Sequence, residues 1–347
     1  MHAFILTNLS PVVEESPPTL KPMPARILLI DRPHEILVQK LGEWGCQVEE
    51  DYHSDPASLI PKLANVNGIV LRSRIAISES LIQASPMLRF VAREGVGTEH
   101  IDLEACRRHH ITVLTSAEGS RDTVAEHTMG LLLCLMNRIA TADRQVRAGQ
   151  WLREPNRGTE LLGKTVGILG YGNMGSAFAR RLTGFGVRTI AYDKYKSNYG
   201  DEYAEEVSLE QLHEQADVLS IHIPYMPQNH YFIDGDFLDR FRKPIFLVNT
   251  ARGLVLKTDD LVERLESGRV TGAALDVLEY EEQSFDKFRL DTLPPAFEYL
   301  RNSDRVVLTP HIAGWSFESK RKHAQVLARK IAELLGKAVD DEGMRAG

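Results

Sequence analysis

A glycine-rich segment, Gly170-Tyr171-Gly172-Asn173-Met174-Gly175, joins an apolar run at 165–169 to a helical pattern at 176–183. Glycines at these spacings allow a tight turn, a close approach of the backbone to a pyrophosphate and close packing of helix against strand, while the helix N-terminus offers N–H donors. The segment is therefore predicted to bind a dinucleotide. The alternative is a strand–helix turn whose glycines are incidental.

An acidic residue follows at the spacing that a dinucleotide-binding fold requires. Asp193 ends the apolar run at 189–192, eighteen residues beyond Gly175. Its carboxylate can accept hydrogen bonds from the adenosine ribose hydroxyls and repel a 2′-phosphate. The sequence therefore predicts NAD rather than NADP as cofactor, a preference that the neighbouring Lys194 and Lys196 weaken.

Further polar groups follow the later predicted strands, at the edge where an open parallel sheet holds its ligands. They are His222-Ile223-Pro224, Asn249-Thr250-Ala251-Arg252-Gly253, Asp276 with Glu281, and Thr309-Pro310-His311-Ile312-Ala313-Gly314. Taken singly, each has a structural explanation: a buried histidine, an arginine at a sheet edge or carboxylates in a loop.

Beside a dinucleotide, these groups together suit hydride transfer at a carbon that bears a hydroxyl. Oxidation of a 2-hydroxy acid removes the hydroxyl proton as the hydride leaves C2, and His311 is the natural general base because imidazole titrates near the working pH. A carboxylate on its other ring nitrogen would fix the tautomer, a role open to Glu281. The planar guanidinium of Arg252 can clamp the substrate carboxylate and polarise the C2 oxygen.

The elements that must position these residues alternate between short apolar runs and amphipathic stretches, which is typical of parallel α/β sheets. A first block has predicted strands at 26–30, 67–71, 88–92 and 111–114, and helices near 34–42, 78–84 and 102–108. One long helix is predicted over 122–148. A second block follows with strands at 165–169, 189–192, 218–222, 245–249, 272–275 and 306–308, and a last helix spans 317–335. Two α/β units are therefore expected.

Composition excludes several classes of protein. The chain has 347 residues, and its 43% apolar and 26% charged positions indicate a folded protein of about two domains. Lys and Arg total 41 against 48 Asp and Glu, and a net charge of −7 disfavours nucleic-acid and membrane partners. The longest apolar stretch, 128–136, falls short of the ~20 residues of a membrane span. Three cysteines without a CxxC pattern predict no metal site and a reducing, cytoplasmic setting.

The order and spacing of GYGNMG, HIP, NTARG, LDVLEYE and TPHIAG resemble those of the D-isomer-specific 2-hydroxyacid dehydrogenase family, which includes 3-phosphoglycerate dehydrogenases. The similarity spans about 26–335. It implies that Arg252, Glu281 and His311 form the catalytic set, with His311 as the acid/base. Motifs and resemblance together predict cofactor contacts from Gly170, Gly172, Asn173, Met174, Gly175, Asp193, His222, Pro224, Thr250, Ala251, Asp276 and Gly314, with Asp276 touching the nicotinamide carboxamide.

The resemblance also implies how the chain divides. Residues 25–119 and 314–336 would form the substrate domain, and 120–313 would form a Rossmann-type NAD-binding domain across a cleft. The proline-rich segment 1–24 is predicted to be a flexible extension and 337–347 a flexible tail.

The family pattern is broken near the predicted catalytic carboxylate. Relatives commonly have proline after this glutamate, whereas Glu281 is followed by Glu282, and Glu279 also lies close. The choice of Glu281 rests on its five-residue offset from Asp276. The acidic, aromatic stretch 283–305 is a candidate lid or subunit contact.

Substrate identity is predicted only as a class, with one leading member. Arg72, Ser73 and Gly95 match substrate-facing positions of the family, while Arg74 could equally be a solvated arginine. A cluster of Arg72, Ser73 and Arg74, joined by Arg93, could hold a phosphate, which favours D-3-phosphoglycerate. Glyoxylate, hydroxypyruvate or D-lactate would be served by the same catalytic set.

Two partner hypotheses accompany the enzyme hypothesis. Transcriptional corepressors related to C-terminal-binding protein are similar in fold and motifs and sense NAD(H), so binding without turnover would favour that class. The helix predicted from 122 has more apolar residues than a helix with one side facing solvent requires. In relatives, this helix and the arm that follows it, which carries Trp151, lie at a two-fold dimer contact. A homodimer is therefore expected.

Overall fold

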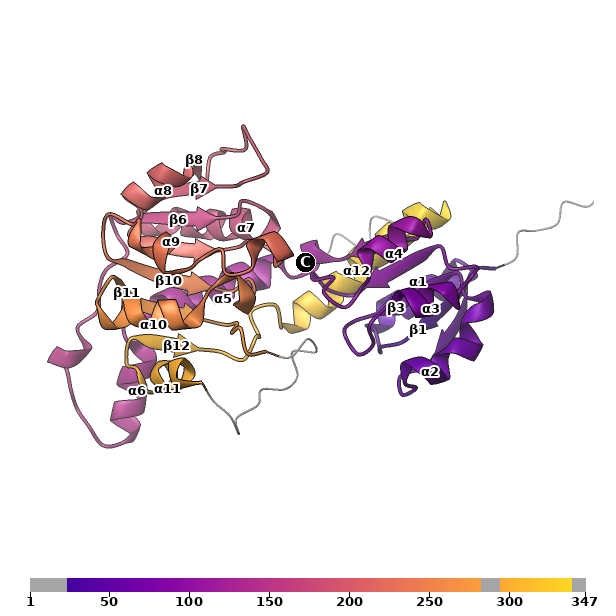
Figure 1. Ribbon diagram of the computed structural model, residues 1–347, viewed down its shortest axis with the longest axis horizontal. Coiled ribbons are helices and arrows are strands. Elements are labelled where there is room, and N and C mark those ends of the chain that lie inside the picture. Colours follow the sequence, from indigo (N-terminus) through magenta and orange to yellow (C-terminus); the bar gives the residue numbers. More distant parts are fainter. Residues whose placement is uncertain (1–23, 282–293, 339–347) are drawn as a thin grey trace, which may run out of the picture.

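The computed structural model describes residues 24–281 and 294–338. They form two α/β units that lie side by side along the longest axis of the molecule (Figure 1). Each unit is built on one sheet, and all strand pairs are parallel. Helices cover both faces of each sheet, which explains the nearly continuous apolar strands. The predicted α/β class with two parallel sheets is confirmed.

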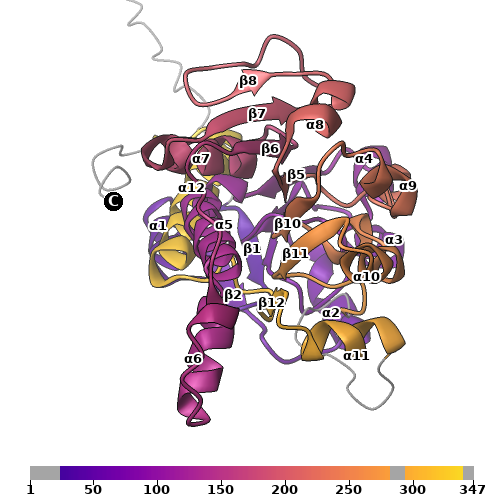
Figure 2. The ribbon, with the colours of Figure 1, turned by 90° about the vertical axis from the view of Figure 1, so that its left-hand side faces the viewer.

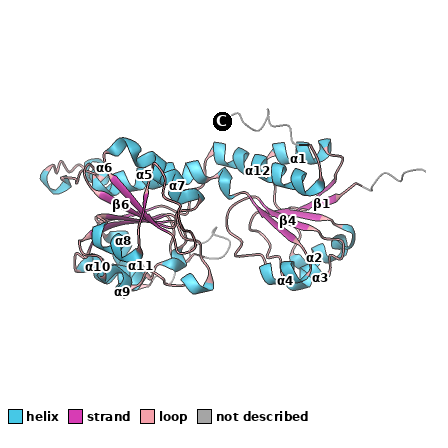
Figure 3. Cartoon of the chain, turned by 90° about the horizontal axis from the view of Figure 1, so that it is seen from above, coloured by secondary structure: helices cyan, strands magenta, loops and turns pink. Residues whose placement is uncertain are grey.

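The first unit has the strand order β2-β1-β3-β4-β5, which is the flavodoxin-like order. Its strands are β1 (Arg26–Leu29), β2 (Gln47–Glu50), β3 (Gly68–Leu71), β4 (Phe90–Arg93) and β5 (Thr112–Thr115). Its helices are α1 (Glu35–Glu43), α2 (Pro56–Leu59), α3 (Glu79–Gln83) and α4 (Leu103–Arg108), with 3-10 turns η1 (Ile60–Asn65) and η2 (Ala117–Gly119). Figure 3 shows α2, α3 and α4 on one face of the sheet and α1 with α12 on the other.

The second unit has the strand order β12-β11-β10-β9-β6-β7-β8, a dinucleotide-binding order extended by one strand. Its strands are β6 (Thr165–Leu169), β7 (Arg188–Tyr192), β8 (Glu205–Glu206), β9 (Val218–Ile221), β10 (Ile245–Asn249), β11 (Val270–Leu275) and β12 (Val306–Leu308). Its helices are α5 (Arg121–Met136), α6 (Ile139–Arg147), α7 (Asn173–Leu182), α8 (Leu209–Gln215), α9 (Gly235–Asp239), α10 (Thr258–Glu266) and α11 (Pro295–Asn302).

The last helix, α12 (Phe317–Leu335), returns the chain to the first unit. Its buried face packs against β1 and β4 in one apolar cluster. That cluster includes Ile27, Leu29, Phe90, Ala324, Leu327, Ala328 and Ile331. The chain therefore crosses between the units twice, once before α5 and once before α12.

The single helix predicted over 122–148 is wrong, because two helices occupy this range. α5 ends at Met136 and α6 begins at Ile139, and Arg138 between them has a left-handed backbone with φ 56°. α6 turns away from the body and projects from it (Figure 2). Neither glycine nor proline marks the break, since Asn137 and Arg138 stand there, so the sequence pattern alone could not show it.

Strand β2 was not predicted, because its sequence QVEE alternates too weakly at a partly exposed sheet edge. The flexible segments expected at the two ends lie almost entirely outside the described residues. Of the stretch 283–305, only the part from 294 is described, and it forms α11.

None of the helices within 24–281 and 294–338 combines the length and apolar character that a membrane crossing requires. These ranges also bring together no group of three or more His, Cys, Asp or Glu side chains that suits a metal ion.

Candidate active site

The glycine-rich turn after β6 has the shape that the sequence predicted, and each glycine has its own reason. Gly170 has φ +95° and lies against the His222 carbonyl, while a Cβ on Gly175 would come within 2.2 Å of the Gly170 oxygen. These two positions exclude side chains because the protein itself is close. Gly172 precedes the first turn of α7, and a Cβ there would meet nothing within 4 Å. That space, beside the N-terminus of α7, fits a phosphate group.

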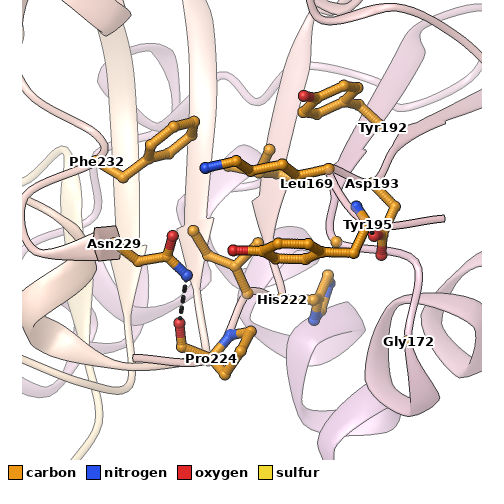
Figure 4. A pocket seen from close by; sticks show the side chains of 12 residues that line it. Leu169, Gly172, Tyr192, Asp193, Tyr195, His222, Pro224, Asn229 and Phe232 are labelled. Carbon is orange, nitrogen blue, oxygen red and sulfur yellow. Dashed lines mark hydrogen bonds between the residues drawn. The ribbon is translucent and has the colours of Figure 1, made fainter. Parts of the chain in front are cut away.

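A pocket lies beside this turn, at the carboxyl ends of β6, β7 and β9 (Figure 4). Its lining combines apolar walls with one carboxylate at the end of β7. The lining residues are Leu169, Gly170, Gly172, Tyr192, Asp193, Lys194, Tyr195, His222, Ile223, Pro224, Asn229 and Phe232. An apolar slot that ends at a carboxylate fits an adenosine, with the carboxylate at the ribose.

Asp193 is held in place by backbone donors. Its Oδ2 accepts from the N–H of Tyr171 and its Oδ1 accepts from the N–H of Tyr195, each at 2.9 Å. Lys196 donates to the Tyr171 carbonyl at 2.7 Å and is therefore occupied with the turn itself. A carboxylate has about four acceptor sites, so Asp193 can still accept from ribose hydroxyls.

His222 lies under the glycine-rich turn as a neutral ring. Its Nε2 pairs with the Ser220 hydroxyl at 2.8 Å, and burial lowers its pKa to about 3. The ring packs on Phe178 with centroids 5.6 Å apart. His222 can therefore shape the pocket but cannot act as a cation toward phosphate.

His311 and Glu281 are brought together from loops that follow neighbouring strands, β12 and β11. The His311 Nδ1 and the Glu281 Oε2 are 2.6 Å apart, and Glu281 Oε1 accepts from the N–H of Leu278 at 2.5 Å. A neutral histidine can donate to a carboxylate only from a protonated nitrogen, so Nδ1 carries the proton and Nε2 is left as an acceptor. Glu279 instead accepts from the N–H of Thr258.

The buried carboxylate of Asp276 organises the loop that carries His311. Its Oδ1 accepts from the Thr309 hydroxyl at 2.6 Å and the Ile312 N–H at 2.9 Å, and its Oδ2 accepts from the Ala313 N–H at 2.8 Å. Burial alone would raise the pKa of Asp276, but hydrogen bonds from His127, Thr309 and the loop N–H groups lower it.

His311 itself has a left-handed backbone, with φ 55°, and its N–H donates to the Asp276 carbonyl at 2.7 Å. Such a conformation costs energy in a non-glycine residue and persists only where the surroundings hold it. Asp276 therefore acts here as the anchor of the His311 loop, in addition to any cofactor contact.

Arg252 lies at the end of β10, next to the strand that leads to Asp276. The turn is bracketed by Asn249, whose side chain accepts from the Ala251 N–H and donates to the Arg252 carbonyl. Thr250 pairs with the Thr128 hydroxyl of α5 at 2.9 Å. A Cβ on Gly253 would lie 2.0 Å from the Leu278 carbonyl, so this turn packs directly on the segment that leads to Glu281.

Two charged side chains of the first unit interact with Arg252: the acidic Glu99 and the basic Arg93. The Nε of Arg252 donates to Glu99 Oε1 at 2.6 Å, a contact that sequence reasoning missed. The only local signal was its position close behind Gly95 and Gly97. Arg93 also lies near Arg252. Burial and the like charge of Arg252 lower the pKa of Arg93 to about 10.

Of the residues expected to face the substrate, Arg74 differs from Arg72, Ser73 and Gly95. The Arg72 guanidinium lies 5.6 Å from the centre of the Trp315 ring, in the segment that leads into α12. Gly95 donates its N–H to the Ser116 hydroxyl, and Ser73 is half-buried between the two arginines. Arg74 does not join a phosphate cluster, because its guanidinium donates to the carbonyls of Ile30, Asp51 and Ser54.

Met174 lies in the first turn of α7, and Gly314 lies against Ser120 at the start of α5. The predicted cofactor residues thus line one continuous edge of the second sheet.

Comparison with known proteins decides the family. Residues 129–313 match the model described as D-isomer specific 2-hydroxyacid dehydrogenase, NAD binding domain. The chain belongs to the D-isomer specific 2-hydroxyacid dehydrogenase family. This dehydrogenase is an NAD-dependent oxidoreductase that acts on a CH–OH group, as the sequence predicted.

Three relatives illustrate the range of the family. The dehydrogenase is 34% identical to a hydroxypyruvate reductase from Thermotoga maritima over 82% of this chain and 90% of that protein. It is 29% identical to D-3-phosphoglycerate dehydrogenase from Homo sapiens over 89% of this chain, which spans only 56% of that relative. The solved D-lactate dehydrogenase from Aquifex aeolicus, complexed with NAD and lactic acid, has a TM-score of 0.75 at 25% identity, covering 90% of this chain and 96% of that one.

The open space at Gly172 gives a test of cofactor binding. A Gly172→Val change places a side chain where no protein atom lies within 4 Å, so the dehydrogenase should fold normally. The side chain should fill the phosphate cradle and weaken NADH binding about tenfold or more. Fluorescence titration with NADH measures the affinity, and thermal unfolding checks the fold.

Gly184→Val is the matched control, since Gly184 also has nothing within 4 Å but lies at the far end of α7. A folded Gly172→Val variant that binds NADH as tightly as this control would contradict the phosphate cradle.

Proposed function

We propose that this dehydrogenase interconverts a D-2-hydroxy acid and its 2-oxo acid, with Arg252, Glu281 and His311 as the catalytic set. The observation that carries the proposal is the 2.6 Å contact between His311 Nδ1 and Glu281 Oε2, at the end of a sheet whose glycine-rich turn fits NAD. Bound NAD(H) supplies the chemistry of hydride transfer at C2.

The protein's own groups handle the proton and the charge. In the reduction direction, His311 donates a proton from Nε2 to the C2 oxygen, and Glu281 stabilises the ring in its charged form before that transfer. In the oxidation direction the neutral Nε2 accepts the hydroxyl proton. His311 and Glu281 are only 22% and 16% exposed, so water competes little for their hydrogen bond.

Arg252 is proposed to bind the substrate carboxylate and to polarise the C2 oxygen. Arg252 follows β10 and His311 follows β12, the two strands that flank β11, and Glu281 comes from the segment after β11. A forked guanidinium matches a carboxylate with two parallel hydrogen bonds, which orients C2 as well as binding it.

Among substrates, D-3-phosphoglycerate is proposed as the leading candidate. Arg93 lies close enough to both Arg252 and Arg72 for their charges to lower its pKa, and these guanidinium groups would stabilise a second anionic group on the substrate. Trp315 under Arg72 would form the wall of the same subsite. Hydroxypyruvate, glyoxylate and D-lactate are the alternatives, and relatives are named as hydroxypyruvate reductase, glyoxylate reductase and D-lactate dehydrogenase.

The first unit with α12 is proposed to be the substrate domain, and the second unit the NAD-binding domain. Arg72, Ser73 and Gly95 all belong to the first unit, at the carboxyl ends of β3 and β4. The glycine-rich turn and the adenosine pocket belong to the second unit.

A His311→Gln variant tests the function. Purified protein with NADH should reduce members of a panel of 2-oxo acids, including 3-phosphohydroxypyruvate, hydroxypyruvate, glyoxylate and pyruvate. Loss of the acid/base should lower kcat about 10²–10⁴-fold while NADH affinity is retained. The matched control is His109→Gln, an exposed residue at the end of α4.

NADH binding by the unaltered protein without turnover of any 2-oxo acid would contradict the dehydrogenase proposal and favour the NAD(H)-sensing class. Full activity of His311→Gln would instead refute His311 as the acid/base.

We further propose a homodimer formed through the projecting arm. α6 and the segment after it expose large apolar side chains, with Ile139 54%, Val146 51% and Trp151 79% exposed. Such side chains on an element that projects into solvent fit a second copy of the chain.

Sedimentation velocity tests this assembly. The protein should sediment as a dimer, and Trp151→Glu should shift it toward the monomer because a charge would be buried in the contact. Met87→Glu, at an exposed site of the first unit, should leave the dimer intact. A monomer at all concentrations would contradict the proposed assembly.

A further inference from the structure

Glu99 holds the guanidinium of Arg252 from the opposite unit. The donor Nε and the acceptor Oε1 are 2.6 Å apart, and the two side chains are 19% and 21% exposed. The Nη1 of Arg252 also donates to the Ala251 carbonyl at 2.7 Å. Because Nε and Nη1 lie on different sides of a planar group, these two bonds fix the direction in which the plane faces.

The charge on Glu99 is stabilised by two arginines. Burial by itself would raise the pKa of Glu99, but Arg252, and to a smaller extent Arg93, hold it below its ordinary value. Burial, and after it the like charge of Arg252, lowers the pKa of Arg93. An ionised Glu99 offsets this repulsion, so the three side chains form one charge cluster across the gap between the units.

The ion pair is also packed closely against backbone. A Cβ on Gly97 would lie 2.0 Å from Glu99 Oε2 and 2.5 Å from Arg252 Nη2. Glu99 Oε2 is buried, and among the described residues it has no hydrogen-bond partner. The loop after β4 therefore touches the Arg252 guanidinium directly, and the geometry leaves little freedom for either side chain.

We propose that Glu99 is a positioning residue, which orients Arg252 toward the substrate carboxylate when the two units are in contact. The inference rests on the role proposed above for Arg252. Glu99 belongs to the first unit and Arg252 to the second, so the correct orientation of the guanidinium depends on closure of the gap between them. Substrate binding and closure are thereby coupled through one ion pair.

Glu99→Gln tests the inference because it removes the charge and keeps the shape. The ion pair becomes at most a hydrogen bond to a neutral amide, so KM for the best 2-oxo acid should rise about 10–100-fold, with a smaller fall in kcat and unchanged NADH affinity. Gly97→Ala should raise KM in the same way, because its Cβ displaces the pair without altering either charge. Steady-state kinetics and NADH titration provide the readouts.

A double-mutant cycle separates positioning from a merely structural role. In an Arg252→Lys background, which lacks the forked guanidinium, Glu99→Gln should raise KM at most a few-fold further. If the two residues acted independently, the increases in KM would multiply. Glu118→Gln is the matched control, since it breaks a partly buried ion pair with Lys330 in the same unit, away from Arg252.

Three results would overturn the inference. The first is a KM for Glu99→Gln equal to that of the control. The second is a KM lower than that of the unaltered protein, which would make Glu99 a competitor of the substrate. The third is that the increases in KM caused by the two substitutions multiply in the double mutant. The proposed function fails separately, if the unaltered protein turns over no 2-oxo acid at all.

Discussion

The hydrogen bond between His311 and Glu281 is the contact on which the proposed chemistry depends. It requires two loops, after β11 and β12, to meet at one point, and the buried Asp276 carboxylate makes this possible by accepting from the Thr309 hydroxyl and from the Ile312 and Ala313 N–H groups. Those bonds offset the left-handed backbone of His311. The strained backbone therefore belongs to His311, the residue that is proposed to move the proton, and the hydrogen bonds to Asp276 maintain this conformation.

A second constraint is that the proposed site is divided between two units. The first unit contributes Arg72, Arg93 and Glu99, and the second contributes Arg252 and the His311 loop. The contacts between the units include two ion pairs, Glu99 with Arg252 and Lys322 of α12 with Asp122 of α5. Contacts of this kind can break and re-form at modest cost, whereas the apolar clusters within each unit cannot. The arrangement thus suits a cleft that opens for ligands.

Sequence reasoning predicted the features whose chemistry is local. The glycine-rich turn, Asp193 and the polar strand ends follow from spacing along one chain segment, and the α/β class follows from alternating periodicity. It did not predict that Glu99 pairs with Arg252, because 153 residues separate them and no local pattern links the two. The backbone carbonyls that accept from Arg74 also lie outside its own chain segment, 20 to 44 residues away in the sequence. The break at Arg138 was hidden because neither glycine nor proline marks it in the sequence.

The most direct test of the account is the tautomer of His311 in solution. Protein labelled with ¹⁵N-histidine gives two-bond proton–nitrogen correlations, and the His311 signals are those absent from the His311→Gln variant. A neutral His311 ring protonated at Nδ1, with Nε2 unprotonated, is the result that the contact with Glu281 predicts. A neutral ring protonated at Nε2 would contradict it, because Nδ1 could then not donate to the carboxylate and the proposed catalytic pair would not exist.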